Sequence, residues 1–297
     1  MPALRELAFF KLLAAVAIPR HCDEWIENVD AVLTGTDIPV IELDNETFAD
    51  RLREAIEENE INMGLVMTFP YKIPSSIYEF PAKGFYNVHP GPLPQYRGAD
   101  PVFQQIKKRE KHAGVTIHKL DDGIDTGPVV ITELLKIEAW GTHGLLTTKL
   151  AYLAGKLTGI LIKLVSFDIA IPSRPQDETK ARYFKRHQAE DIMINWQTMD
   201  ADSIIALINA CNPWNKGAVA KINNRVIRLL DAEKLTENSS LYKEPGYIIS
   251  LEKKGMIVST IHDQAIIVRI LYSEEGFLGA SHLGRLGVVP GNRFEII

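Results

Sequence analysis

The sequence predicts an α/β domain followed by a small β domain: a doubly wound, mostly parallel, Rossmann-like sheet and then an OB-like β-barrel. In residues 1 to about 170, short apolar runs alternate with segments of helical periodicity, which is typical of a parallel sheet with helices on both faces. After this point, short strand-like runs follow one another with turn residues between them, which favours an antiparallel barrel. We therefore predict two domains, residues 1–180 and residues 181–297.

Apolar runs predict the strands of the first domain, and apolar residues at three- and four-residue intervals predict its helices. The strands are expected at 14–18, 39–43, 62–69, 84–88 and 114–120, with helices at 4–13 and 47–58. The clearest helix is 142–164, whose apolar stripe consists of Leu146, Leu150, Leu153, Leu157, Ile160 and Leu164.

The second domain is predicted to contain one short helix, 203–210, before its strands. The strands are expected at 218–222, 226–230, 247–250, 255–261 and 265–271. Residues 171–187 carry prolines and charges with little periodicity, so we predict that they form a linker between the domains.

The beginning of the chain departs from the usual pattern of a doubly wound domain. Such domains open with a strand and a glycine-rich turn, whereas this sequence opens with a predicted helix and contains no GxGxxG. The sheet is therefore expected to lack its first strand, either truly or because the sequence starts downstream of its natural beginning. We favour the second explanation.

Composition and charge indicate a globular cytoplasmic protein. The formal net charge of −5 gives no global positive field for DNA or acidic membranes. The apolar run 12–18 is too short to span a bilayer, and no signal-peptide cleavage site follows it. Cys22 and Cys211 stand in no metal-binding or CxxC pattern, so we expect them to be reduced thiols in the cytoplasm.

The segment 87–127 concentrates the residues that could carry chemistry. Asn87 and His89 are two residues apart at the end of a predicted strand, so both side chains project from one face. A stiff loop rich in proline and glycine follows, and then a second strand that ends in a turn containing Asp121, Asp122 and Asp125. If the two strands are neighbours, an amide, an imidazole and a carboxylate meet at one sheet edge.

These three groups suit the transfer of an acyl group to an amine. Histidine can move protons near neutral pH or hydrogen-bond the oxyanion, and an asparagine amide is a fixed donor to that oxyanion. A carboxylate can orient the histidine and accept the amine proton. We therefore predict Asn87, His89 and Asp125 as catalytic residues.

Other polar residues are given structural roles. We expect Asp121 and Asp122 to be turn residues rather than catalysts, and His118 to be structural or to support the site indirectly. The remaining histidines show no metal-ligand spacing, so no metal is predicted. Trp196 and Trp214 are interpreted as core residues of the second domain, with stacking on an RNA end as the alternative.

The segment resembles the signature of the folate-dependent formyltransferases. That signature consists of N-x-H, a proline-containing loop ending in a basic residue and glycine, and a later D-T-G turn. The matching parts here are 87–89, 93–98 and 125–127, so the resemblance places the catalytic triplet on Asn87, His89 and Asp125. It extends to the second domain, where 194–196, 212–214 and 290–293 are most like methionyl-tRNA formyltransferases.

The resemblance implies a Rossmann-like catalytic domain that uses 10-formyltetrahydrofolate as a co-substrate. It places the folate-contacting loop on Gly91, Pro92, Leu93 and Pro94, although the family usually has serine and leucine in place of Gly91 and Pro92. The loop after strand 62–69 ends at the same sheet edge, so we expect the folate pocket to be completed by Met67, Phe69, Pro70, Tyr71, Ile73, Asp122 and Ile124.

The acceptor of the formyl group is less defined than the donor. The resemblance favours the amino group of initiator methionyl-tRNA, and a basic patch could form from Lys216, Lys221, Arg225 and Arg228. Against tRNA, the region 19–25 is short and partly acidic, where the tRNA enzymes typically carry a basic insertion. An amino-sugar nucleotide or another small amine, a formate-releasing hydrolase and a non-catalytic folate-binding homologue remain as alternatives.

Overall fold

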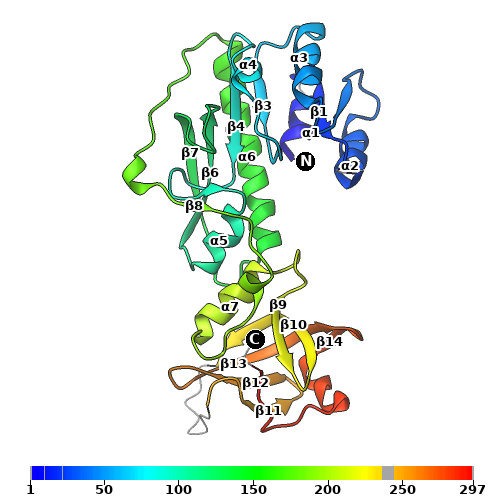
Figure 1. The fold of residues 1–297 in the computed structure, drawn as a ribbon, viewed down its shortest axis with the longest axis vertical. Coiled ribbons are helices and arrows are strands. Elements are labelled where there is room, and N and C mark those ends of the chain that lie inside the picture. The colour runs from blue at the N-terminus through cyan, green and yellow to red at the C-terminus, as the bar shows by residue number, and fades with distance from the viewer. Residues whose placement is uncertain (1, 10, 22, 236–243, 296–297) are drawn as a thin grey trace. The chain divides into compact units, whose positions relative to one another are not determined.

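The computed structural model describes residues 2–9, 11–21, 23–235 and 244–295 (Figure 1). It consists of two compact units. The first contains residues 1–101, 113–135 and 147–184, and the second contains 102–112, 136–146 and 185–297. The sequence predicted a single division at residue 180, whereas two earlier segments also group with the second unit.

The first unit is the predicted α/β domain with a mixed, partly parallel sheet. Its main strands are β1 (Val16–Pro19), β2 (Val40–Leu43), β3 (Gly64–Val66), β4 (Phe85–His89), β6 (His112–Lys119) and β7 (Val129–Lys136). β1 pairs with β2 in parallel, as does β3 with β4, whereas β6 runs antiparallel to β4. The predicted fold class is confirmed.

In the part of the chain that the structure describes, the strands of this unit do not form one continuous sheet. β1 and β2 make a two-stranded piece, and the other strands make a four-stranded piece in the order β3-β4-β6-β7. One long edge of β1 and one of β3 therefore have no strand partner among the described residues.

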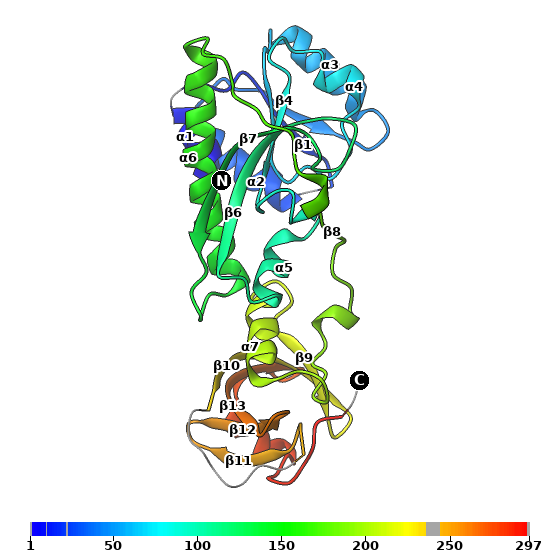
Figure 2. The same ribbon diagram turned by 90° about the vertical axis from the view of Figure 1, so that its left-hand side faces the viewer.

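Helices cover the faces of these sheet pieces, as Figure 2 shows for α6 beside β6 and β7. They are α1 (Pro2–Phe9), α2 (Asp23–Leu33), α3 (Phe48–Glu58), α4 (Ser75–Tyr78), α5 (Pro101–Lys107) and α6 (His143–Ser166). α3 buries Leu52 and Ile56 against Leu43 of β2, which is the packing that its helical spacing predicts.

α6 is long and apolar enough to cross a membrane by length and composition alone, but its apolar stripe belongs to the domain core. Leu150, Leu157 and Leu161 are at most 2% exposed. Ile160, which the sequence pattern placed in this stripe, is 41% exposed, because the inward face runs through Leu161 instead.

The second unit is a small antiparallel domain, and the predicted barrel-like fold is confirmed. Its sheet has the order β11-β12-β13-β10-β9, and β14 also pairs with β13. These strands are β9 (Ala218–Ile222), β10 (Arg225–Lys234), β11 (Ile248–Glu252), β12 (Gly255–Thr260), β13 (Gln264–Ser273) and β14 (Gly276–Gly279). Helix α7 (Ala201–Ala210) precedes them, capped by the Asp200 carboxylate, which accepts from Ser203 N–H at 2.7 Å.

The two tryptophans of interest differ in their surroundings. Trp196 is 2% exposed and stacks on Phe294, as expected for a core residue. Trp214 is 66% exposed, so its interpretation as core is wrong. Cys211 is buried, and Cys22 lies outside the described residues.

The expected linker is packed onto the first unit over most of its length. Arg174 forms an antiparallel bridge with Val129, and β8 (Tyr183–Phe184) pairs in parallel with β5 (Arg97–Gly98). We call residues 174–184 the strap. The strap is irregular but makes specific contacts. Its sequence shows little periodicity, as a loose linker would, so the sequence alone does not distinguish the two.

Candidate active site

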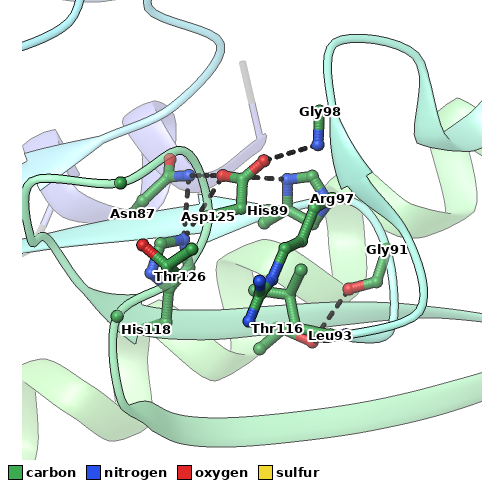
Figure 3. Close-up of polar contacts among 12 residues, drawn as sticks. Asn87, His89, Gly91, Leu93, Arg97, Gly98, Thr116, His118, Asp125 and Thr126 are labelled. Carbon is green, nitrogen blue, oxygen red and sulfur yellow. Dashed lines mark hydrogen bonds and ion pairs between the residues drawn. The ribbon is translucent and has the colours of Figure 1, made fainter. Parts of the chain in front are cut away.

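Asn87 and His89 occupy the end of β4, where their spacing places both side chains on one face of the strand. In the antiparallel register, Asn87 lies opposite His118 and His89 lies opposite Thr116. The neighbouring strand β6 then leads into the turn that carries Asp125. The structure thus brings the three predicted catalytic side chains together at one edge of the sheet (Figure 3).

The Asp125 carboxylate is the centre of this group. Its Oδ1 accepts a hydrogen bond from Asn87 Nδ2 at 3.1 Å and lies 3.6 Å from His89 Nδ1, and its side chain is 10% exposed. Its Oδ2 accepts from the Gly98 N–H at 2.8 Å. Asp125 has a φ of 56°, a left-handed conformation that aspartate adopts more readily than most residues.

Gly98 is required at its position by close backbone packing. Its φ is 102°, and a Cβ built there would lie 2.2 Å from the Phe184 carbonyl oxygen of the strap. A side chain at residue 98 would therefore push away the backbone N–H that binds Asp125.

His89 is held by a hydrogen bond in which its Nε2–H donates to the Tyr96 carbonyl oxygen. In the neutral imidazole, Nδ1 is then the acceptor, and it faces Asp125. Burial lowers the pKa of His89 below its usual 6.5, and this effect outweighs the opposing effect of Asp125. His89 is thus neutral at pH 7.

Burial is the largest single effect and raises the pKa of the Asp125 carboxyl, but several opposing effects together leave it below its usual 3.8. These effects come from the His118 imidazole, whose Nε2 lies 3.5 Å from Asp125 Oδ1, from the adjacent His89 imidazole, and from the hydrogen bond donated by the Gly98 N–H. Asp125 is therefore a carboxylate at neutral pH. A carboxylate beside a neutral imidazole nitrogen is an arrangement that can accept and stabilise one proton.

The lowered pKa of His89 predicts a pH dependence of stability. Below pH 6.5 the unfolded chain protonates this histidine before the folded chain does, so folding stability is complete above pH 6.5 and falls as the pH drops. The contribution is at most about 1.4 kcal/mol per pH unit. The variant His89→Gln keeps a donor for Tyr96 but does not titrate. Urea unfolding at pH 7.0, 6.0 and 5.5 should show a shallower loss in this variant, and equal slopes would contradict the prediction.

His118 supports the triplet from the neighbouring strand β6, where it lies opposite Asn87. It is 1% exposed, its Nδ1 donates to the Lys119 carbonyl oxygen at 2.8 Å, and its Nε2 accepts from Asn87 Nδ2 at 3.2 Å. Both hydrogens of the Asn87 amide are therefore engaged, one with His118 and one with Asp125. The indirect role expected for His118 agrees with this geometry.

Thr116 fixes the loop that the resemblance assigns to folate binding. Its hydroxyl donates to the Gly91 carbonyl oxygen at 2.8 Å and accepts from the Leu93 N–H at 3.2 Å. The sequence pattern around Thr116 predicted no role for this residue. The strand register could have identified Thr116, because this residue lies directly opposite His89 on the antiparallel strand β6.

The strap supplies supporting residues that the sequence analysis missed. Gln176 Nε2 donates to the carbonyl oxygens of Asp125 and Gly127, each at 2.8 Å. Arg97 is fully buried and donates to Gln176 Oε1 at 2.9 Å. Its guanidinium also forms a bidentate ion pair with the Glu178 carboxylate at 2.6 and 2.9 Å. The strap thus holds the backbone of the D-T-G turn in place. No local pattern signals contacts between residues about fifty to eighty positions apart.

The residues predicted to bind folate differ in accessibility. Ile124 is 61% exposed beside Asp125, whereas Ile73 and Leu93 are each 7% exposed and contribute mainly to packing. Phe69 and Tyr71 form an edge-on ring pair. Met67, Pro70, Gly91, Pro92 and Pro94 lie in the same two loops, and their folate contacts stay a prediction.

Asp121 and Asp122 both take part in local structure. Asp121 Oδ1 accepts from the Gly123 N–H and the Thr126 hydroxyl at 3.1 and 2.6 Å, as expected for a turn residue. Asp122, assigned to the folate pocket, accepts from the Tyr78 hydroxyl at 3.1 Å and is exposed. Within the described residues, no group of three or more acidic, histidine or cysteine side chains is suited to a metal ion.

An α/β domain with an amide, an imidazole and a carboxylate at its sheet edge has the groups that acyl transfer to an amine can use. Residues 36–159 match the formyl transferase family, and residues 186–276 match the formyl transferase C-terminal domain. The chain therefore belongs to the folate-dependent formyltransferases.

Curated relatives named methionyl-tRNA formyltransferase match most of the chain. The protein of Dehalococcoides mccartyi is 32% identical over 76% of this chain and 70% of its own length. The proteins of Kosmotoga olearia and Staphylococcus aureus are 31% and 28% identical, over 69% and 83% of this chain and 65% and 78% of their own lengths.

Solved structures of low sequence identity share the fold. HypX from Aquifex aeolicus, in complex with tetrahydrofolic acid, is 18% identical with a TM-score of 0.62, over 91% of this chain and 47% of HypX. The sugar 3N-formyl transferase WlaRD, in the presence of dTDP and 5-N-formyl-tetrahydrofolate, is 20% identical with a TM-score of 0.56, over 82% of this chain and 92% of its own.

Proposed function

We propose that this protein transfers the formyl group of 10-formyltetrahydrofolate to the α-amino group of initiator methionyl-tRNA in the cytoplasm. The observation that carries the formyl-transfer part is the meeting of Asn87, His89 and Asp125 within hydrogen-bonding or ion-pairing distance. The names of the curated relatives support the choice of acceptor.

The hydrogen bonds of His89 assign it the part of a proton carrier. Its Nε2 is committed to Tyr96, so Nδ1 is the atom that accepts the proton lost by the attacking amine. Asp125, 3.6 Å away, stabilises the resulting imidazolium. Of the two roles that the sequence allows for a histidine here, this geometry supports proton transfer rather than donation to the oxyanion, because a neutral Nδ1 carries no hydrogen.

Asn87 then provides the hydrogen bond to the developing oxyanion. Its amide exchanges the bond to Asp125 for one to the formyl oxygen, while His118 keeps the amide oriented through the other hydrogen. The new carbon–nitrogen bond forms to the acceptor amine, and the bond to N10 of the donor breaks. The proton on His89 leaves with that nitrogen.

The residues at this sheet edge are suited to a folate. Exposed Ile124 and the Phe69–Tyr71 ring pair offer apolar surface on two segments that both follow strands. When bound, the donor supplies an electrophilic formyl carbon and an amine leaving group. The loop 91–94, fixed by Thr116, is proposed as the second wall.

One observation favours the alternative acceptor, an amino-sugar nucleotide. The basic residues expected to contact tRNA phosphates are largely engaged within the second unit. Lys221 pairs with Glu295 at 2.6 Å, and Arg225 pairs with Glu275 at 2.8 Å. Paired cations contribute less to phosphate binding, because the partner carboxylate must be displaced.

Presenting competing acceptors to the enzyme tests the proposal. The protein is incubated with 10-formyltetrahydrofolate carrying a labelled formyl group, together with charged initiator methionyl-tRNA or with amino-sugar nucleotides. We expect label on the tRNA, with a KM that rises with salt, because phosphate contacts release counterions. Tetrahydrofolate analogues should also shift the amide signals of residues 67–74 and Ile124.

Methionyl-tRNA with an acetylated amino group is the matched control, since it keeps every phosphate but cannot be formylated. Label on the sugar nucleotide alone would replace the tRNA assignment. Formate released at the same rate without any amine would identify a hydrolase. Folate binding without either product would identify a non-catalytic homologue.

A further inference from the structure

The turn 121–127, which carries Asp125, is held in place by side chains. None of its residues takes part in a backbone–backbone hydrogen bond within the part of the chain that the structure describes. The Asp121 carboxylate secures the first part of the turn from within. The carbonyl oxygens of Asp125 and Gly127 are instead bound from outside the turn, by Gln176 of the strap. The position of Asp125 therefore depends on a residue 51 positions away in the sequence.

The backbone at Asp125 needs such support because its conformation is unfavourable. Its φ of 56° lies in the left-handed region, which is crowded for a residue with a Cβ. Such a conformation persists only where the surrounding structure determines it. Gln176 binds the carbonyl oxygen of Asp125 itself, and so holds the peptide plane that follows the strained residue. Relaxation of the turn would rotate the Cα–Cβ bond and carry the carboxylate away from His89.

Arg97 determines which way the Gln176 amide points. Its guanidinium donates to Gln176 Oε1 from Nε and from one terminal nitrogen, at 3.1 and 2.9 Å. The other N–H groups bind both carboxylate oxygens of Glu178 and the Tyr183 hydroxyl, so all five donors of this buried side chain are engaged. A reversed amide would set its NH2 against the guanidinium and its oxygen against two carbonyl oxygens. All four hydrogen-bonding positions of the amide are therefore filled in this orientation alone.

The residues on either side of Arg97 contact the triplet directly. The Tyr96 carbonyl oxygen accepts from His89, and the Gly98 N–H donates to Asp125 (Figure 3). The backbone of this segment pairs with the strap, as β5 with β8. The strap that orients the Asp125 backbone thus also holds the groups that bind the imidazole and the carboxylate.

We propose that Gln176 is a positioning residue for formyl transfer, which sets the Asp125 carboxylate against the His89 imidazole through its two hydrogen bonds to the turn. Arg97 and Glu178 hold Gln176 in the orientation that this requires. This role rests on the catalytic roles given to the triplet in the proposed function, and it is independent of which amine accepts the formyl group. Gln176 acts through the turn, so its contribution is to kcat rather than to folate binding.

The variant Gln176→Glu tests this role, because it keeps the length of the side chain and its contact with Arg97. A carboxylate has no hydrogen to donate, so its second oxygen would repel the carbonyl oxygens of Asp125 and Gly127. Misplacement of a catalytic group by about 1 Å costs about 10²-fold, so kcat should fall by about that factor while the KM for 10-formyltetrahydrofolate changes little. The assay follows labelled formyl transfer to methionyl-tRNA, or to the amino-sugar nucleotide if the parent formylates that acceptor instead.

The NMR signal of the Gly98 amide provides a readout that is independent of turnover. This N–H is bonded to the Asp125 carboxylate at 2.8 Å, so in Gln176→Glu its resonance should move upfield and its exchange should quicken. If Gln176 only stabilised the strap, Tm would fall while the Gly98 signal and kcat kept their parent values. Gln188→Glu is the matched control, because Gln188 also donates to a carbonyl oxygen, that of Arg186, away from the turn. It should leave both readouts unchanged.

The double variant Gln176→Glu with Glu178→Gln separates positioning from charge. It keeps one carboxylate and one amide beside Arg97, exchanged between the two positions, so it also serves if the single variant does not fold. The donors to the turn are still missing, so kcat should stay low. Near-parent kcat in the double variant or in Gln176→Glu would overturn the role of Gln176. A parent without formyl transfer, or an Asp125→Asn variant with near-parent kcat, would instead count against the proposed function.

Discussion

Replacing Asp125 by asparagine should lower turnover by about 10²–10⁴-fold while the affinity for a tetrahydrofolate analogue changes little. The carboxylate accepts two hydrogen bonds, from Asn87 and Gly98, and lies beside the imidazole nitrogen that carries the proton. An asparagine offers only one acceptor and no charge, so it cannot stabilise the imidazolium. Steady-state kinetics and analogue titration measure the two quantities.

The variant Asp121→Asn is the matched control, because it makes the same chemical change four residues away in the same turn. Asp121 accepts from Gly123 and Thr126 within its own turn and from neither Asn87 nor Gly98, so turnover should stay close to that of the parent. Thermal unfolding of both variants separates loss of chemistry from loss of structure. Near-parent turnover of Asp125→Asn would refute the assigned role of the carboxylate.

The double replacement Asn87→Ala with His89→Ala should lower kcat/KM by a much smaller factor than the product of the factors for the two single replacements. Loss of an oxyanion donor costs roughly 10²–10³-fold and loss of a proton carrier roughly 10²–10⁴-fold. Both groups act on one transition state, and each contacts Asp125, so either loss disables the unit. The measurement is kcat/KM for the parent, both single variants and the double variant.

A pair of exposed residues outside the site provides the comparison for this cycle. Asn45→Ala and His112→Ala remove the same side-chain types from the surface and should combine additively with small effects. Multiplicative losses at Asn87 and His89 would mean that the two residues act independently, contrary to the shared network of the structure.

The meeting of Asn87, His89 and Asp125 was predictable because its determinants are local, whereas their catalytic roles stay a prediction. Asn87 and His89 belong to one strand with a two-residue period, and Asp125 belongs to a turn that directly follows the next strand of that sheet. The supporting contacts were not predictable in this way. Gln176 and Glu178 come from an irregular segment, and their partners Asp125 and Arg97 are fixed only by the tertiary fold.

The same contrast applies to the secondary structure. α3 was predicted closely because its apolar spacing coincides with its buried face. The stripe of α6 was displaced by one residue at Ile160, since an almost continuously apolar helix gives little contrast between its faces. β7 was missed because its residues are mostly only half-buried, which weakens the alternation that identifies a strand.

At residue 125 the residue that would most favour folding stability differs from the one that activity requires, because the backbone there is left-handed. Its φ of 56° costs on the order of 1 kcal/mol for a residue with a Cβ, and glycine would remove that cost. Glycine would also remove the carboxylate that Asn87, His89 and Gly98 surround. Selection for folding alone would therefore favour a different residue here from selection for chemistry. Redesign of this chain for thermal tolerance should hold residue 125 fixed and seek its gains elsewhere.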